Sequence, residues 1–577
     1  MKQQSKKLNV NNKVKIVNVV NQLQQAMNFH NAGDFENARE GYQNILTADS
    51  KNFDALHLLG VIETQTGNLE KAVEYFTDAI AINSSSPDIF NNRAGLYTYL
   101  KRHNDALKDC DKAIYLNPTF VEAHLNRSQI LLELKQYEEA LISCDKVIQL
   151  KNYPEAYNTR GAILKKLGRH QEALDNFNIA LSINNNFVDA YNNRGVLIQE
   201  LGDPATSISN YNNAIRLRPE YVEAWANRAS AYQDLNQLDD TLSNYNHALE
   251  LRPEDPMIRM HRAFAYLTNG QYKEGWEEYE WRKKTPIFVN SKKYPQPVYT
   301  GKEDLSSKTI LLYTEQGLGD SIQFSRYINL VSELATEVIV EAEESLLYIF
   351  ASSFPDNVKL IKQGRKIPEF DYHCSLMSLP WAFSTTVDSI PFSKSYLVGD
   401  PIKRKYWNKK LGAHDKLRVG LVWNGGFRPD RVDLWYVNLR RNILLEKFAV
   451  LSNPDINFYS LQKGEAAEAE LAKLKNKKWK GPRIIDYTQD LTDLSDTAAL
   501  IENLDLVITV DTSIAHLAAG LGKPTWILNR FDSCWRWMRN REDSPWYSAV
   551  KLYTQETYGD WDSVLKRVQT DLSKYKV

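Results

Sequence analysis

The chain has 577 residues, few cysteines and no long apolar run. Its four cysteines form no CxxC pair and no dense framework, which argues against a disulfide-stapled secreted domain. No apolar stretch is long enough to cross a membrane, so no membrane span is expected. The basic N-terminal segment has no uninterrupted apolar core, so we expect no secretory signal there. These features together predict a cytoplasmic protein.

An excess of charge of one sign is also missing. Lys and Arg number 71, Asp and Glu number 72, and the formal net charge is −1. This balance gives no general attraction for a polyanion, so nucleic acid is not an expected partner. The composition is 43% hydrophobic and 25% charged, as in ordinary globular proteins, and the length exceeds that of a single typical domain.

A repeat of about 34 residues runs from Asn18 to Arg282. This is the period of the tetratricopeptide repeat (TPR), a pair of antiparallel helices. Cys110 and Cys144 take the place of a core aromatic in their repeats, so we expect them to be packing residues. We predict a tail at residues 1–17 and an α-solenoid at residues 18–282, with about seven repeats and a partial eighth. A small residue recurs at one position of the first helices, at Ala26, Gly60, Ala94, Ser128, Gly161, Gly195, Ala229 and Ala263.

Asparagine recurs at one position of several first helices, at Asn92, Asn126, Asn193 and Asn227, and an arginine follows each one. Equivalent positions of a solenoid form a continuous stripe. An amide donates and accepts hydrogen bonds, so such a stripe can hold an extended peptide backbone, and we expect a protein or peptide acceptor there. The alternative is that these residues only hydrogen-bond neighbouring repeats to one another, and that the arginines only pair with acidic residues.

Residues 283–307 are rich in proline and lysine and are predicted to be a linker, and the aromatic segment Glu274–Arg282 is expected to pack the last repeat against the next domain. Strands then alternate with helices, which predicts two parallel sheets in paired Rossmann-like lobes, at residues 308–412 and 413–577. The expected strands are Lys308–Tyr313, Glu337–Val340, Val358–Ile361, Leu417–Trp423, Ile456–Leu461, Arg483–Asp486, Leu506–Val510 and Thr525–Leu528.

Three polar turns follow expected strands: Gly317 to Asp320, Asn424-Gly425-Gly426, and Asp511-Thr512-Ser513. Ligands of such folds bind at the carboxyl ends of the strands, so we expect the three turns to surround one cleft. The third turn opens a helix expected at Ile514–Leu521, and a helix N-terminus with free N–H groups favours a phosphate. An ordinary capped turn is the alternative.

The motifs EQGLGDSIQFSRY, VGLVWNGG, LQKGE, DLVITVDTSIAHLAAGLGKP and WRWMRNREDSPWYS, with the segment around Arg441, lie within residues 308–550. In these stretches the chain resembles glycosyltransferase family 9, the ADP-heptose:lipopolysaccharide heptosyltransferase type, and as a whole it resembles bacterial TPR proteins fused to a GT-B fold. Its layout is also similar to that of O-GlcNAc transferases and flagellin glycosyltransferases. The resemblance implies a solenoid followed by a GT-B fold of two Rossmann-like lobes.

The resemblance also implies roles for single residues. The catalytic base falls on Asp320, in a turn with Gly317 and Gly319. The implied donor-binding residues are those two glycines with Asn424, Gly425, Gly426, Gln462, Lys463, Asp511, Thr512, Ser513 and His516. Ser513 stands where many relatives have glycine, and the insertion around Phe427–Val437 leaves the roles of Arg428 and Arg431 open.

Each of these residues also has a plainer interpretation. Asp320 suits the N-cap of a helix expected at Ser321–Leu334, Gln323 suits a partner that supports a ligand-binding residue or a surface residue, and Lys463 suits a solvated loop. His516 is expected to face the cleft. The tryptophans of the last motif are expected to pack the end of the lobe. The DxD pairs at Asp109 and Asp560 follow no lobe strand, so neither a metal nor another cofactor is expected.

The sequence and this resemblance together predict a metal-independent glycosyltransferase (class EC 2.4) that uses a nucleotide-sugar donor, and the resemblance implies inversion. The expected acceptor is a Ser or Thr hydroxyl of a protein such as flagellin, held by the repeats. Two alternatives stay open. One is a TPR binding protein whose lobes are inactive or sense a nucleotide sugar, and the other is a transferase acting on a surface glycan.

Overall fold

The computed structural model describes residues 19–286, 288, 294–426, 440–475, 479 and 481–576. The predicted tail at residues 1–17, Arg428 and Arg431 lie outside the described residues. Among the described helices, none is long and apolar enough to cross a membrane. The chain divides into two compact units, of which the first ends at Leu197 and the second begins at Ile198. This border falls within the repeats, while the predicted domain borders at 282 and 412 remain predictions.

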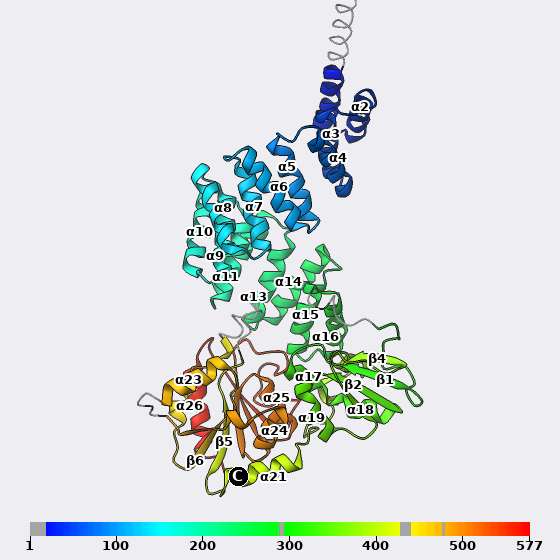
Figure 1. Ribbon diagram of the computed structural model, residues 1–577. Coiled ribbons are helices and arrows are strands. Elements are labelled where there is room, and N and C mark those ends of the chain that lie inside the picture. Colours follow the sequence, from blue (N-terminus) through cyan, green and yellow to red (C-terminus); the bar gives the residue numbers. More distant parts are fainter. Residues whose placement is uncertain are drawn as a thin grey trace, which may run out of the picture. The chain divides into compact units, whose positions relative to one another are not determined.

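The first unit is a solenoid of antiparallel helix pairs (Figure 1). The reason for the small residues of the first helices is visible here, since a Cβ added at Gly60 would lie 2.5 Å from the ring of Phe76. Cys110 and Cys144 are fully buried, as the repeat pattern predicts. After helical residues 19–31 the helices are α2 (Phe35–Ala48), α3 (Phe53–Gln65), α4 (Leu69–Ile82), α5 (Pro87–Tyr99), α6 (His103–Leu116), α7 (Val121–Glu133), α8 (Tyr137–Leu150), α9 (Pro154–Lys166), α10 (His170–Ile183) and α11 (Val188–Glu200), which carries the border.

The arginines that follow the asparagine stripe join neighbouring second helices. Arg127 on α7, for example, donates to Asp111 on α6 and to Ser143 on α8, both at 2.7 Å. The partners lie about sixteen residues before and after each arginine, so one guanidinium links the second helix of its own repeat to that of the preceding repeat. The same pattern joins Arg93 to Thr77 and Asp109, Arg160 to Asp145 and Asn176, Arg228 to Asn212 and Asn244, and Arg262 to Asn246 and Glu278.

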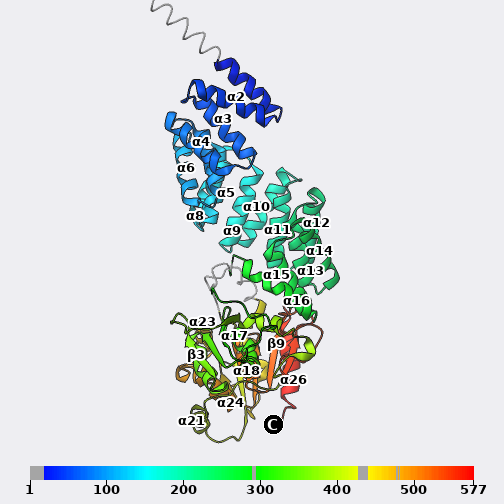
Figure 2. The same ribbon diagram turned by 90° about the vertical axis from the view of Figure 1, so that its right-hand side faces the viewer.

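The second unit begins with the remaining repeats and continues into two α/β lobes (Figure 2). Its repeat helices are α12 (Pro204–Leu217), α13 (Val222–Asp234), α14 (Leu238–Leu251), α15 (Pro256–Thr268) and the shorter α16 (Tyr272–Tyr279), followed by the 3₁₀ helix η1 (Glu280–Lys284).

The first lobe is built on a four-stranded parallel sheet with strand order β3-β2-β1-β4. Leu311 of β1 pairs in register with Ile339 of β2 and His373 of β4. Its elements are β1 (Thr309–Tyr313), α17 (Leu318–Phe324), α18 (Tyr327–Leu334), β2 (Glu337–Ala342), α19 (Glu344–Ser353), β3 (Val358–Lys362), β4 (Tyr372–Ser375), η2 (Leu376–Ser378), α20 (Leu379–Ala382), η3 (Val387–Ser389) and α21 (Pro401–Leu411).

The second lobe has a six-stranded parallel sheet with strand order β10-β9-β8-β5-β6-β7. Leu421 of β5 pairs with Ile508 of β8, and both are fully buried. The elements are β5 (Leu417–Val422), η5 (Leu445–Leu451), β6 (Ile456–Ser460), α23 (Glu465–Lys475), β7 (Ile484–Asp486), η6 (Thr488–Asp490), α24 (Leu494–Glu502), β8 (Leu506–Val510), α25 (Ser513–Gly520), β9 (Thr525–Asn529), β10 (Val550–Thr554) and α26 (Trp561–Leu572).

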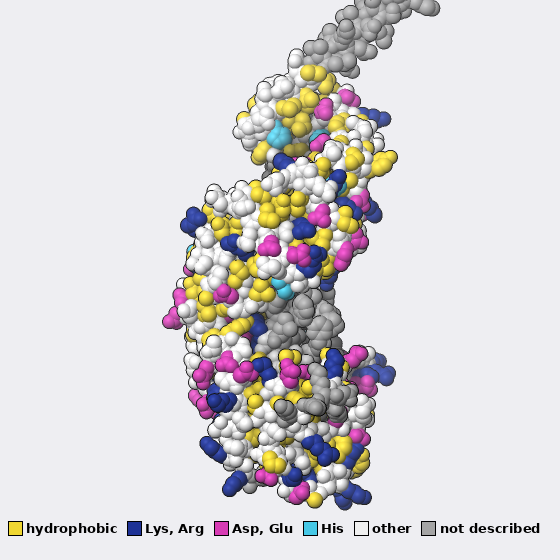
Figure 3. All heavy atoms as spheres, turned by 90° about the vertical axis from the view of Figure 1, so that its left-hand side faces the viewer, with side chains coloured by type: hydrophobic (Ala, Val, Ile, Leu, Met, Phe, Trp, Pro, Cys, Tyr) yellow, Lys and Arg dark blue, Asp and Glu magenta, His cyan; other side chains and the backbone are white. Residues whose placement is uncertain are grey.

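The solenoid followed by parallel α/β sheets is the predicted fold class. Two strands, β4 and β10, were not expected from the sequence, and both lie at or near a sheet edge. The helix expected at Ser321–Leu334 is wrong in its start and its continuity, since α17 begins at Leu318 and a break after Phe324 separates it from α18. On the face in Figure 3, basic and acidic side chains are interspersed, in keeping with the balanced net charge.

Candidate functional site

The loops after β5 and β8 meet at the point where the strand order of the second sheet reverses. These two strands are hydrogen-bonded neighbours although two other strands, β6 and β7, lie between them in the sequence, and such a switch point is where open α/β sheets bind ligands. Arg441 joins the loops, because its Nη2 donates to the carbonyl oxygen of Gly425 at 2.9 Å and its Nη1 to that of Asp511 at 3.0 Å. Two of the three predicted turns are therefore adjacent.

Two side-chain amides fix the backbone of the loop after β5 by hydrogen bonds. Gln462 accepts from the N–H groups of Trp423 and Asn424 at 3.1 and 2.9 Å, and donates back to the carbonyl oxygen of Asn424 at 2.9 Å. Asn442 accepts from Gly425 N–H at 2.8 Å. Gln462 is 4% exposed and supports the loop through these bonds. Its direct contact with a donor remains a prediction.

Lys463 and Gly426 lie at the margin of this loop. The ammonium group of Lys463 donates to the backbone oxygen of Leu491, and Gly426 N–H donates to Asn424 Oδ1 at 3.0 Å. Gly426 has a φ of +74°, a conformation that side chains rarely adopt. Lys463 is thus a partner of a backbone carbonyl in this structure, and phosphate neutralisation by it remains a prediction.

The glycine-rich turn of the first lobe packs directly on the helix that follows β8. A Cβ added at Gly319 would lie 3.1 Å from His516 Cδ2 and 3.5 Å from Ser513 Cα. The side chain missing from Gly319 is what permits this approach. All three predicted turns therefore come together, with α17 of one lobe against α25 of the other.

Asp320, the neighbour of Gly319, also bonds a residue of the second lobe. Its Oδ1 accepts a hydrogen bond from Arg536 Nη2, and the side chains are 19% and 15% exposed, so the pair is mostly shielded from water. The cap interpretation of Asp320 is wrong, because α17 is capped at Gly317 and Asp320 lies in its first turn. The pKa of Arg536 is raised: burial alone would lower it, but the neighbouring Asp320 carboxylate outweighs burial.

The sequence did not single out Arg536 as a site residue. It lies in the WRWMRNRED stretch, where arginines alternate with tryptophans, and nothing local distinguishes it from Arg539 or Arg541. Arg539 donates to the carbonyl oxygen of Gln233 at 2.6 Å, and Arg541 pairs with Asp543 at 2.7 Å. Only the packing of the two lobes shows which arginine reaches Asp320.

His516 is the buried centre of the contact between the lobes. It is 3% exposed, its ring stacks on Trp537 with centroids 4.9 Å apart, and its Nδ1 lies 2.9 Å from the Tyr547 hydroxyl. Burial lowers its pKa to about 3, so the imidazole is neutral near pH 7. The tryptophans Trp535, Trp537 and Trp546 are 5%, 0% and 0% exposed, which confirms that they pack the lobe.

Asp511 and Thr512 form the turn at the start of α25. Burial would raise the pKa of the Asp511 carboxyl, but the nearby Arg441 guanidinium more than offsets it, and the net pKa is lowered. Thr512 is the N-cap in an extended conformation, and its Oγ1 lies 3.2 Å from Thr509 Oγ1. Asp511 therefore contributes a stable negative charge that Arg441 balances.

Gln323 lies one turn beyond Asp320 and Gly319 on α17, on the face that these residues share. It is fully buried, so the surface interpretation is wrong. Within the described residues neither its amide oxygen nor its amide nitrogen has a hydrogen-bond partner. A buried amide without partners is costly, so Gln323 is a feature of the site that the packing leaves unsatisfied.

Three of the stripe asparagines bond to the preceding repeat. Asn126 donates to Asn91 Oδ1 at 2.9 Å, Asn193 donates to Asn158 Oδ1 at 3.0 Å, and Asn92 lies 3.2 Å from His57 Nε2. These bonds agree with the alternative in which the stripe holds the repeats together. They engage the amide nitrogens, and binding of an acceptor through the stripe remains a prediction.

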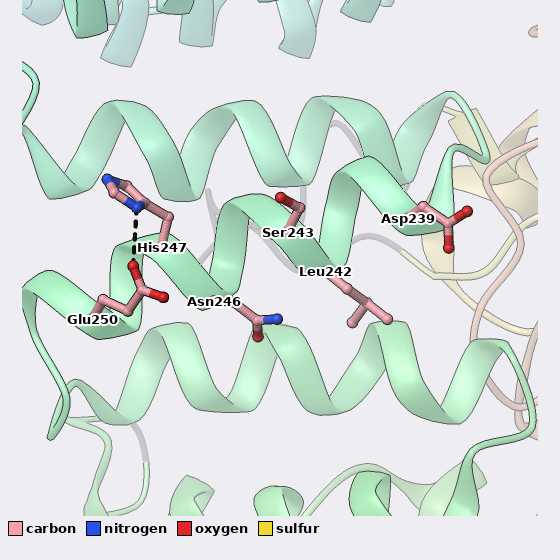
Figure 4. A pocket seen from close by; sticks show the side chains of 6 residues that line it. All are labelled: Asp239, Leu242, Ser243, Asn246, His247 and Glu250. Atoms are coloured by element: carbon pink, nitrogen blue, oxygen red, sulfur yellow. Dashed lines mark hydrogen bonds and ion pairs between the residues drawn. The ribbon is translucent and has the colours of Figure 1, made fainter.

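A shallow hollow of about 470 Å³ lies away from these turns, on helix α14 (Figure 4). His247 and Glu250 point toward one another there, 3.1 Å apart. All six lining residues come from this single helix, and none was predicted from the sequence: Asp239, Leu242, Ser243, Asn246, His247 and Glu250.

The two DxD pairs have structural partners. Asp109 and Asp111 accept from Arg93 and Arg127, and Asp109 is only 6% exposed. Asp560 caps α26, and Asp562 pairs with Lys447. Within the described parts of the chain, no three His, Cys, Asp or Glu side chains come together in a group able to hold a metal.

Comparison with protein families finds two kinds of match. The family described as "Glycosyltransferase family 9 (heptosyltransferase)" matches residues 461–528, which include Gln462, Lys463 and the Asp511–His516 segment. Models of the tetratricopeptide repeat match residues 23–87, 87–120, 110–142, 154–187, 188–221 and 222–255. The chain thus combines tetratricopeptide repeats with a glycosyltransferase family 9 segment.

A sequence relative and two solved structures match longer parts of this chain. "Protein FlbA" from Caulobacter vibrioides is 29% identical over 339 residues, which cover 54% of this chain and 54% of that protein, so the match spans about half the length of this relative. A TPR protein from Parabacteroides merdae is 21% identical, covering 42% of this chain and 96% of that one, with a TM-score of 0.39. PilF from Pseudomonas aeruginosa is 20% identical, covering 37% and 97%, with a TM-score of 0.32.

Proposed function

We propose that this protein is an inverting glycosyltransferase that moves a sugar from a nucleotide-activated donor to a hydroxyl of a protein. The observation that carries the proposal is the close packing of Gly319, the neighbour of Asp320 in one lobe, on Ser513 and His516 of the other, beside the Asp320–Arg536 bond. A carboxylate and a helix N-terminus facing each other provide a base for the acceptor and a cradle for a phosphate. The family 9 match over residues 461–528 supports the same chemistry.

In the proposed reaction the acceptor oxygen forms a bond to the anomeric carbon while the bond from that carbon to the nucleotide phosphate breaks. Arg536 holds Asp320 Oδ1, and Oδ2 accepts the proton of the acceptor hydroxyl. The departing phosphate is stabilised by the N-terminus of α25 and by Arg441, which already spans the two loops. His516 is neutral because it is buried; it positions α25 and transfers no proton in this scheme.

The acceptor that we propose is a Ser or Thr hydroxyl of a protein held by the solenoid, with flagellin as the first to test. Repeats of this kind expose long helical surfaces that suit an extended chain better than a small molecule. We also propose that no divalent metal takes part, because the DxD pair after β10 is already engaged: Asp560 caps α26 and Asp562 pairs with Lys447.

The test begins with the purified full-length protein and a thermal-shift screen of nucleotide sugars. ADP-heptose, a UDP-hexose and a CMP-nonulosonate represent the donor classes. A donor at 100 times its dissociation constant should add about 2.7 kcal/mol to the free energy of unfolding. Transfer to purified flagellin is then followed by intact-protein mass, before and after exhaustive EDTA treatment, and should persist after it.

Asp320→Asn is the matched variant, because asparagine is nearly the same size and cannot accept the proton. We expect it to bind donor normally and to lose transfer by at least about 10²-fold. A donor that binds without any transfer would favour the sensing alternative. Near-normal transfer by Asp320→Asn would remove Asp320 as the base, and complete loss of activity in EDTA that Mg²⁺ restores would refute metal independence.

A further inference from the structure

The last repeat lies against the turn that carries Asp320. The hydroxyl of Tyr279, at the end of α16, accepts a hydrogen bond of 2.6 Å from Gln316 Nε2. Gln316 comes immediately before Gly317, the cap of α17. Tyr279 is 2% exposed, and its ring lies 6.2 Å from that of Trp535, the neighbour of Arg536. A residue of the terminal repeat thus contacts Gln316 and Trp535, which flank the Asp320–Arg536 pair in sequence.

A second residue of the terminal repeat region bonds the residue just before Gln316. Arg282 of η1 is fully buried and donates to Glu315 Oε1 through Nε at 2.8 Å and Nη2 at 2.6 Å. Its Nη2 also donates to Ser378 Oγ at 2.7 Å. Burial would lower the pKa of Arg282, but the carboxylates of Glu280 and Glu315 outweigh burial and raise it, so the residue is charged.

These contacts fall at the switch point of the first sheet. Glu315 follows β1, Ser378 follows β4, and the strand order reverses between β1 and β4. In open α/β sheets this crevice is where a ligand binds. Here the guanidinium of Arg282 lies between the residues that follow β1 and β4, so the terminal repeat supplies a fixed part of the first lobe.

We propose that the terminal repeat is a working part of the active site, in which Tyr279 and Arg282 are positioning residues for the Asp320 turn. They fix Glu315 and Gln316, which set where α17 begins and therefore where the Asp320 carboxylate lies relative to Arg536. The terminal repeat and the lobes then act as one catalytic unit, and an acceptor bound to this repeat approaches a turn that the repeat itself holds in place. This inference rests on the proposed transferase function.

The chain offers a matched control at the same junction. Tyr272, two helix turns earlier on α16, is also 2% exposed, and its hydroxyl accepts a hydrogen bond of 2.9 Å from Trp546 Nε1. Tyr272→Phe and Tyr279→Phe each remove one buried hydroxyl that joins α16 to a lobe. Only the Tyr279 hydroxyl touches the Asp320 turn, so a general loosening of the junction should affect both variants alike.

The experiment compares the two full-length variants by hydrogen exchange and by kinetics. We expect Tyr279→Phe to speed amide exchange of residues 316–324, and to lower kcat at least fivefold with little change in donor KM. Tyr272→Phe should leave the exchange of these amides and kcat unchanged. We expect both tyrosine variants to lower the melting temperature by a similar amount. Arg282→Lys, which keeps the charge but loses the forked geometry, should reproduce the effect of Tyr279→Phe.

Equal exchange of residues 316–324 in the two tyrosine variants, or an unchanged kcat in Tyr279→Phe, would overturn the proposal. The exchange measurement needs no donor and no acceptor. If the wild-type protein transfers no sugar at all, the proposed function fails, and the exchange result still shows separately whether the repeat holds the turn.

Discussion

Asp320 and Arg536 form an ion pair across 216 residues of sequence, from the first lobe to the second. The carboxylate stands on the first turn of α17, and the guanidinium comes from the tryptophan-rich loop after β9. Because each side chain is less than one fifth exposed, neither charge is well compensated by water if the other is removed.

The pair should therefore show energetic coupling. Arg536→Met should lower the free energy of unfolding by about 1–3 kcal/mol, since it leaves Asp320 without its charged partner. With Asp320→Asn in the same chain, the combined effect should be smaller than the sum of the two by about 0.5–3 kcal/mol. Denaturant unfolding of the four proteins measures this coupling, and strictly additive effects would show that the pair contributes nothing.

Gly319 should not tolerate a side chain. In Gly319→Ala the new methyl group would lie 3.1 Å from His516, whose ring is stacked on Trp537 and cannot move freely. We expect a loss of about 1–3 kcal/mol in stability and weaker donor binding, measured by unfolding and calorimetry.

Gly95→Ala is the control for this change. Gly95 lies in α5 and has no atom near the added Cβ, so alanine there should be neutral or stabilising by up to about 1 kcal/mol. If the two variants behave alike, the close contact between α17 and α25 does not exist in solution.

The stability of the lobes should fall in acid through His516. Its folded pKa is lowered to about 3 from an ordinary value of 6.5, so below pH 6.5 the unfolded chain takes up a proton that the folded chain does not. The loss grows as the pH falls from 6.5 toward 3, and should be about 2 kcal/mol at pH 5. His516→Phe should remove this part of the pH dependence in denaturant unfolding, and an identical pH slope in both proteins would contradict the buried neutral imidazole.

Changes to the asparagine stripe and changes to the arginines that follow it should have different effects on acceptor kinetics. We expect that changing Asn92, Asn126, Asn193 and Asn227 to alanine raises the acceptor KM while donor hydrolysis stays nearly the same. Arg127→Met, on the same helix as Asn126, should lower stability by about 1 kcal/mol through its lost bonds to Asp111 and Ser143, without raising that KM. Unchanged acceptor kinetics in a folded four-alanine variant would assign the stripe to repeat packing alone.

The sequence by itself determined the elements whose signals are local. The 34-residue period predicts the solenoid because every helix pair repeats the same packing positions, and an unbroken apolar run predicts β8 at Leu506–Val510, where it lies. The convergence of the three turns also followed from sequence, because parallel strands all bring their carboxyl ends to one edge of a sheet.

Only the tertiary structure decided which side chains act on these turns. The sequence leaves Asp320 open as a helix cap or as the base, and Arg536 becomes its partner only when the two lobes pack. Gln323 is a polar residue that the fold buries completely. Arg282 is at the end of a repeat in the sequence, and the fold places it against Glu315 of the first lobe. The physical reason is that burial and pairing between residues far apart in sequence depend on how whole elements pack, which no short stretch of sequence contains.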